Sequence, residues 1–235
     1  MAIFASGCAN RYDMKVDAIS RGGPATPQVA AAPAPEPVSY HIRSSKNQED
    51  EDSLRFKEAA RFVKTALSGR GMYEAPNAEQ AEMIVDLDYG IGPPRALMEM
   101  RSEPIYITLP GRTYTERVQV GTDRNGNPIY QVVTMQEPPT TEYAGDREYQ
   151  VMVVKYEKYL RMTARENKEA TEGRPPPEVW TVDITTDGES KNLRKYIPIM
   201  AAASIDYIGA DTRGQKSVTL KEEKDGAVAF VKKGM

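Results

Sequence analysis

Two aspartates separated by one residue are the best-placed candidates for catalysis in this chain. Asp86 and Asp88 fall in a segment, residues 83–91, in which apolar and polar residues alternate, so both point to the same face of a predicted strand. Two adjacent carboxylates can bind a divalent cation or share a proton. Solvated aspartates on the wet face of a half-exposed strand produce the same pattern, and we favour that interpretation.

The other residues that could do chemistry give weaker patterns. His41 is the only histidine, and its alternation with Tyr40 and Ile42 predicts a position on the solvent face of a strand. A serine–histidine–aspartate triad would need this histidine, and the chain has no G-x-S-x-G segment to hold the serine. We therefore expect no catalytic residue and no enzyme activity.

Metal and cofactor sites are not expected either. One Cys and one His exclude a disulfide framework and a Cys/His zinc site. Asp123, Asn125 and Asn127 have the spacing that begins a calcium loop, but Pro128 and Thr134 stand where Gly and a bidentate Glu are required. These residues are also typical of hairpin turns, which is the interpretation we adopt.

Composition narrows the function classes. The chain has 235 residues, with 31 basic and 34 acidic side chains and a net charge of −3, which argues against a nucleic-acid partner. No apolar run approaches the ~18 residues that a membrane-spanning helix needs. No small-molecule ligand is indicated.

The single cysteine lies in a distinctive segment, Phe4-Ala5-Ser6-Gly7-Cys8. It resembles the lipobox of bacterial lipoproteins, in which a signal peptidase cuts before a cysteine that is then acylated. The resemblance implies that residues 1–7 are a residual signal peptide and that Cys8 is the lipidation site. The apolar stretch before Cys8 is shorter than the ~7–15 residues of a working signal peptide, so the alternatives are a start further upstream or a cytoplasmic protein that begins at Met1.

Residues 8–37 are expected to form the lipid anchor and a tether. Residues 24–37 are rich in Pro and Ala, which favours an extended linker. Residues 11–19 alternate like a short strand, so the alternative is that they join the sheet and the Pro/Ala segment is a loop. With the tether interpretation, a fragment that starts near Pro37 should fold alone.

Residues 38–235 are predicted to form one α+β domain. The domain begins with an alternating segment around Tyr40, an amphipathic helix that opens at Ser53 and is stopped by Gly69 and Gly71, and a strand over residues 83–91. A strand around Trp180, a helix from Ser190 to residue 208 and a hairpin around residues 225–226 end it. We expect a two-layer α/β sandwich with a mixed, mostly antiparallel sheet, two main helices and an inserted β-hairpin.

The inserted hairpin is expected at about residues 103–137. Strand-like segments flank Asn125-Gly126, a strong hairpin-turn signal. Tyr106, Tyr114 and Tyr130 are spread along it, and tyrosine is enriched at protein interfaces because it offers a large contact area at low entropic cost. These three are the predicted partner-binding residues; the alternative is that the hairpin only widens the sheet.

The whole chain resembles a class of bacterial envelope lipoproteins with a lipobox, a short tether and one small periplasmic α/β domain. The resemblance implies attachment to the membrane through Cys8, and Ala9 after the cysteine implies the periplasmic face of the outer membrane. The predicted function is a binding or scaffold module with a protein partner in the envelope. The alternatives are a metal-dependent enzyme that uses Asp86 and Asp88, or a cytoplasmic interaction protein.

Overall fold

The computed structural model describes residues 10–21, 37–46, 48–169, 175–222 and 225–234. Cys8 and most of the predicted tether lie outside these residues. The strands are β1 Arg11–Ser20, β2 Ser39–Ser44, β3 Tyr73–Glu74, β4 Met83–Leu109, β5 Thr113–Thr122, β6 Pro128–Gln136, β7 Thr140–Glu166, β8 Glu178–Gly188 and β9 Lys216–Lys221. The helices are α1 Leu54–Gly69, α2 Leu193–Ser204 and α3 Gly226–Lys233, with 3-10 turns at Gln48–Asp52, Ala78–Gln80 and Ile205–Tyr207.

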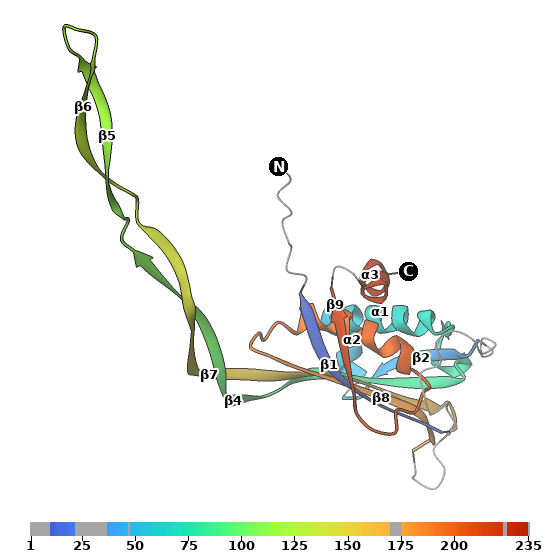
Figure 1. The fold of residues 1–235 in the computed structure, drawn as a ribbon. Helices are drawn as coiled ribbons and strands as arrows, with labels where there is room; N and C mark the ends of the chain where they lie inside the picture. Colours follow the sequence, from blue (N-terminus) through green and yellow to red (C-terminus); the bar gives the residue numbers. More distant parts are fainter. Residues whose placement is uncertain (1–9, 22–36, 47, 170–174, 223–224, 235) are drawn as a thin grey trace. The chain divides into compact units, whose positions relative to one another are not determined.

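Seven strands form one mixed sheet in the order β3-β2-β4-β7-β8-β1-β9, and β5 pairs with β6 separately (Figure 1). β2 runs parallel to β3 and β4, whereas β8 is antiparallel to β7 and β1, and β1 is antiparallel to β9. The expected α+β class with a mixed sheet is confirmed. The described chain has three helices, one more than expected.

The chain divides into two units, which we call the body and the ribbon. The body consists of residues 1–96 and 154–235, and the ribbon is Leu97–Val153. β4 and β7 each begin in one unit and end in the other. The ribbon is longer than the expected hairpin of residues 103–137 because the outer parts of β4 and β7 extend it.

α1 begins and ends at the residues that its sequence signals predict. The Ser53 side chain accepts a hydrogen bond from the Phe56 amide at 3.1 Å, which satisfies one of the unpaired amides of the first turn. Val63 and Leu67, four residues apart, are fully buried against the sheet. The helix ends at Gly69, and Gly71 adopts a positive φ of 84°.

α2 starts later than expected. The Asn192 side chain, and not that of Ser190, caps it by accepting from the Lys195 amide at 3.3 Å. Ser190 instead accepts from the Asn192 amide at 3.1 Å, which builds the turn before the helix. Pro198 is the sixth residue of the helix, and the Met200 side chain beyond it is fully buried.

The predicted C-terminal hairpin is wrong, because its second half is helix α3. The Asp225 side chain caps this helix by accepting from the Ala227 amide at 3.0 Å. Val228 and Val231 are both fully buried. Residues three apart share one face of a helix but lie on opposite faces of a strand, so only the helix buries both valines.

β1 lies inside the sheet, between β8 and β9. Tyr12, Met14, Val16 and Ala18 alternate with polar residues and are all buried in the main core. The folded body therefore includes β1, which supports the alternative that residues 11–19 join the sheet and argues against independent folding of a fragment from Pro37. Such a fragment would leave the inner edges of β8 and β9 unpaired and open the core.

Replacing Met14 with alanine tests the place of β1. Met14 is 2% exposed, so Met14→Ala should lower the free energy of unfolding by about 2–5 kcal/mol, through lost burial and a cavity. Ile19, on the same strand but 60% exposed, is the matched control, and Ile19→Ala should change stability by less than about 0.5 kcal/mol. Urea denaturation measures both. Equal effects would show that β1 does not pack in the core.

Candidate functional site

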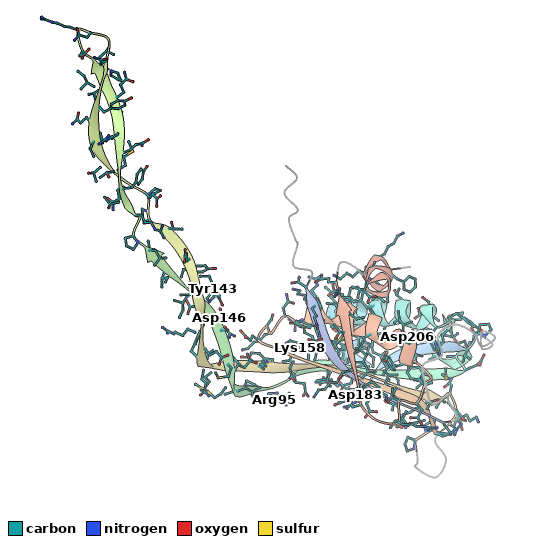
Figure 2. All side chains as sticks on the ribbon, viewed as in Figure 1. Arg95, Tyr143, Asp146, Lys158, Asp183 and Asp206 are labelled. Atoms are coloured by element: carbon teal, nitrogen blue, oxygen red, sulfur yellow. The ribbon has the colours of Figure 1, made fainter. Side chains whose placement is uncertain are left out.

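Most of the exposed large apolar side chains in the described parts of the chain belong to the ribbon. Figure 2 shows side chains on both faces of this two-stranded element. The most exposed are Met98, Met100, Tyr106, Val132, Tyr143 and Met152. Exposed large apolar side chains gathered on one element are a typical mark of an interaction site. The body, although larger, exposes few such side chains: Ile19, Leu54, Tyr73, Ile91, Val154 and Phe230.

The reason for this exposure is architectural. Among the described residues, β5 and β6 form a separate two-stranded antiparallel pair. β2 pairs with β4 only over Met83–Leu87, and β8 pairs with β7 only over residues 156–165, so neither reaches the ribbon. The ribbon contributes nothing to the main core of the body. Two strands without a third or a covering layer cannot bury their side chains.

A close backbone approach marks the junction between β4–β7 and β5–β6. The Glu137 amide donates to the Arg112 carbonyl oxygen at 2.9 Å. A Cβ atom at Gly111 would lie 1.7 Å from the Glu137 carbonyl oxygen, so no other residue fits there. Arg112 and Glu137 therefore face each other at the base of the β5–β6 hairpin.

The tip of the hairpin is a turn closed by Asp123, as the sequence predicts. Its Oδ1 accepts hydrogen bonds from the amides of Asn125 and Asn127 at 2.8 and 2.9 Å, and Gly126 has a φ of 86°. The backbone hydrogen bond from Asn127 is the main cause of the lowered pKa of the Asp123 carboxyl. The carboxylate therefore binds the backbone amides of its own turn, which agrees with the hairpin interpretation of this segment.

The three tyrosines predicted to bind a partner all lie on the ribbon and are exposed. The Tyr106 ring contacts that of Tyr143 edge-on, with centroids 6.0 Å apart. The Tyr114 hydroxyl lies 3.6 Å from the Met135 sulfur, and Tyr130 pairs with Gln119 across the hairpin. Their exposed fractions are 62%, 45% and 57% for Tyr106, Tyr114 and Tyr130. Sequence reasoning missed Tyr143 and the exposed methionines of β4 and β7.

Asp86 and Asp88 lie on the sheet face that points away from the main core, as their alternation predicts, but cations hold each of them. Arg43 forms an ion pair with Asp86, and Arg165 Nε lies 3.3 Å from Asp86 Oδ2. Lys46 Nζ lies 3.2 Å from Asp88 Oδ1. The hydrogen bond to Asp86 is the main cause of the raised pKa of Arg43. Each aspartate therefore has its own basic partner, and the pair does not form an open cation site.

His41 lines a hollow of about 730 Å³ beside this network. Its side chain is half-buried, between the buried Tyr40 and Ile42, and faces away from the core as expected for this strand face. His41 Nδ1 is buried without a hydrogen-bond partner in the described structure. Within those same residues, no group of three or more His, Cys, Asp and Glu side chains could hold a metal ion.

Lys158 is a buried charge that the sequence analysis overlooked. It is fully buried on β7, and its Nζ donates to the carbonyl oxygens of Tyr156 and Gly188, each at 3.1 Å (Figure 2 labels Lys158). The Tyr196 ring lies 4.4 Å away, in a cation–π contact. Desolvation lowers the pKa of this lysine. The alternation of the strand does predict this burial, because position 158 lies two residues before Leu160 and four before Met162. Its side chain therefore points to the same face as these two core residues.

Comparisons with known proteins are sparse. No protein-family model matches the chain. No curated protein matches it. A search of solved structures finds the crystal structure of a PDZ domain protein from Parabacteroides distasonis at 2.50 Å resolution, with 9% sequence identity and a TM-score of 0.38. The alignment covers 91% of this chain, which spans 40% of that structure. Among the described helices, none has the length and apolar character needed to cross a membrane.

Removing the Asp86 carboxylate tests whether this network is structural. Asp86 is 15% exposed as a side chain and accepts from two arginines, so Asp86→Asn should lower the free energy of unfolding by about 1–3 kcal/mol. Asp52→Asn is the matched control, because this carboxylate is 96% exposed and its pair with Lys57 should contribute under about 1 kcal/mol. Urea denaturation compares the two. A thermal midpoint of the parent chain that rises with added magnesium or calcium would instead support a cation site.

Proposed function

We propose that this protein is a protein-binding module of the bacterial cell envelope and that its binding element is the ribbon. The observation that carries the proposal is the concentration of exposed large apolar side chains on Leu97–Val153. A monomeric soluble protein rarely keeps such a surface unless a partner covers it. Methionine and tyrosine make up half of the exposed large apolar side chains of the ribbon. Methionine adapts to partners, and tyrosine provides a large contact area.

The body supports this role as a scaffold. Its three helices and main sheet share one main core, and the opposite face of the sheet carries ion pairs such as Arg43–Asp86 and Arg161–Asp183. The carboxylates on which the enzyme alternative depends are held by Arg43, Arg165 and Lys46. Binding therefore has structural support that the catalytic alternative lacks.

Anchoring at the outer membrane, on its periplasmic face, completes the proposal. It rests on the lipobox-like residues before Cys8 and on Ala9, all of which lie outside the described residues. A single acyl chain binds membranes only marginally, whereas two or three chains hold a protein firmly, since each buried methylene contributes about 0.8 kcal/mol.

Lipidation is tested by detergent phase partitioning. Full-length protein expressed in a Gram-negative host should enter the detergent phase, because its acyl chains dissolve in the micelles. Cys8→Ser should stay in the aqueous phase, and Ser6→Ala, which keeps a small residue before the cysteine, should behave like the parent. If the parent and Cys8→Ser partition alike, the anchor proposal is wrong.

The role of the ribbon is tested by removing its distal hairpin. Residues 113–136 are replaced by Asn-Gly, which joins the facing residues Arg112 and Glu137 through a two-residue turn. The thermal midpoint should stay unchanged, because no ribbon residue belongs to the main core. Crosslinks from the full-length protein to envelope proteins should be lost.

Two results would contradict this role. A large fall in the thermal midpoint would show that the hairpin stabilises the body. Unchanged crosslinking in a stable variant would show that partners bind elsewhere. The matched control replaces only the turn residues Arg124 and Asn125 by alanine, which leaves both strands in place and should preserve the crosslinks.

A further inference from the structure

β6 is an uncharged strand at an open edge. Its sequence, Pro128–Gln136, contains only apolar and neutral polar residues, rich in β-branched and aromatic side chains. In the described structure its hydrogen-bonded neighbour is β5, so its other edge has no strand beside it. High β-propensity, no charge and no interior proline are the properties of a segment that pairs readily with another strand.

The two edges of this hairpin are not equivalent. β5 carries Glu116 and Arg117, and its pairing with β6 shifts by one residue between Gln119 and Gly121. Charges and bulges of this kind hinder edge-to-edge pairing, because a charge would be desolvated and a bulge interrupts the ladder. β6 has no charge, and its residues follow one another without a shift. The ribbon also contains no lysine, the residue that most often protects an edge.

We propose that two copies of this chain pair antiparallel through β6, with Val132 of one copy opposite Val132 of the other. The inference rests on the proposed function and names the partner as a second copy. The result is a four-stranded sheet in the order β5-β6-β6-β5. It gives the hairpin the third and fourth strands that a two-stranded ribbon lacks.

A second copy is the partner that best fits this edge. Antiparallel pairing centred on Val132 brings Tyr130 opposite Thr134 and Ile129 opposite Met135, so aromatic, β-branched and apolar side chains meet across the interface. No pair in this register contains a charge. The same symmetric pairing of β5, centred on Glu116 or Arg117, would place two like charges opposite each other. Two-fold pairing of identical strands closes on itself as a dimer.

A glutamate at the two-fold axis tests the pairing. Val132 lies opposite Arg117 within its own hairpin, so Val132→Glu adds a favourable cross-strand pair there. In the proposed dimer it would instead place two carboxylates face to face. The measurement is molar mass by light scattering, on the full chain carrying Cys8→Ser so that lipid does not contribute. The parent should have twice the 26.1 kDa of one chain, and Val132→Glu should have the mass of one chain.

Two further variants make the test specific. Thr115→Glu places the same charge on the same face of the hairpin but on β5, and it should remain dimeric. Mixing Val132→Glu with Val132→Arg should restore a dimer, because opposite charges then meet at the axis. The thermal midpoint of each variant shows that the body stays folded.

The proposal is overturned if the parent has the mass of one chain at all concentrations, or if Thr115→Glu dissociates and Val132→Glu does not. Failure to restore the dimer in the mixture would also overturn this register. These outcomes differ from failure of the proposed function. A monomeric parent whose crosslinks to envelope proteins still depend on residues 113–136 would retain the binding role and replace the second copy by another protein.

Discussion

The main-chain pairing of β1 is the constraint on which the rest of the body depends. β1 is hydrogen-bonded to β8 on one edge and to β9 on the other, so without it β9 has no described place in the sheet. Thr212 donates its hydroxyl to the Ala18 carbonyl oxygen, and the Ala18 amide donates back to that hydroxyl, each at 3.0 Å. The Tyr12 hydroxyl donates to Glu222 at 2.8 Å, which ties the residue after β9 to β1. The place of β9 in the sheet thus follows from β1.

Local sequence signals were sufficient for the elements whose ends are set by neighbouring residues. Ser53, Gly69 and the Asn125-Gly126 turn could be recognised because the hydrogen bonds of a helix cap or a turn join residues that are only a few positions apart in the chain. The long-looped hairpin of β7 and β8 was also predictable from two alternating runs separated by prolines. The alternation of β1 was visible too. Its partners were not, because Asp13 and Thr186, which share a hydrogen bond, are 173 residues apart in the chain.

The elements and residues that were not predicted from sequence depend on contacts between distant parts of the chain. The apolar segment around Val228 and Val231 is too short for its periodicity to decide between strand and helix, and only the burial of both valines in one core selects the helix. Lys158 is tolerated in a core position because two carbonyl oxygens and the Tyr196 ring, which come from three different elements, replace its water. At the candidate site, the strands that carry the three tyrosines could be predicted from sequence, whereas the binding role of these tyrosines stays a prediction. These tyrosines are exposed because β2 and β8 end before they reach the ribbon. Where those strands end is a property of the whole sheet and could not be predicted from the ribbon sequence.

The lack of lysine on the ribbon has a practical consequence for chemistry on this protein. Primary amines of side chains occur only in the body, since residues 97–153 contain none. Reagents that acylate amines therefore modify the body and leave the side chains of the ribbon unmodified. A label attached to a lysine therefore lies on the body, and its signal does not report contacts of the ribbon directly. The guanidinium groups of the ribbon, such as those of Arg117 and Arg124, and its methionine thioethers are the handles for arginine-directed and oxidative footprinting, so these reagents can map its contacts directly.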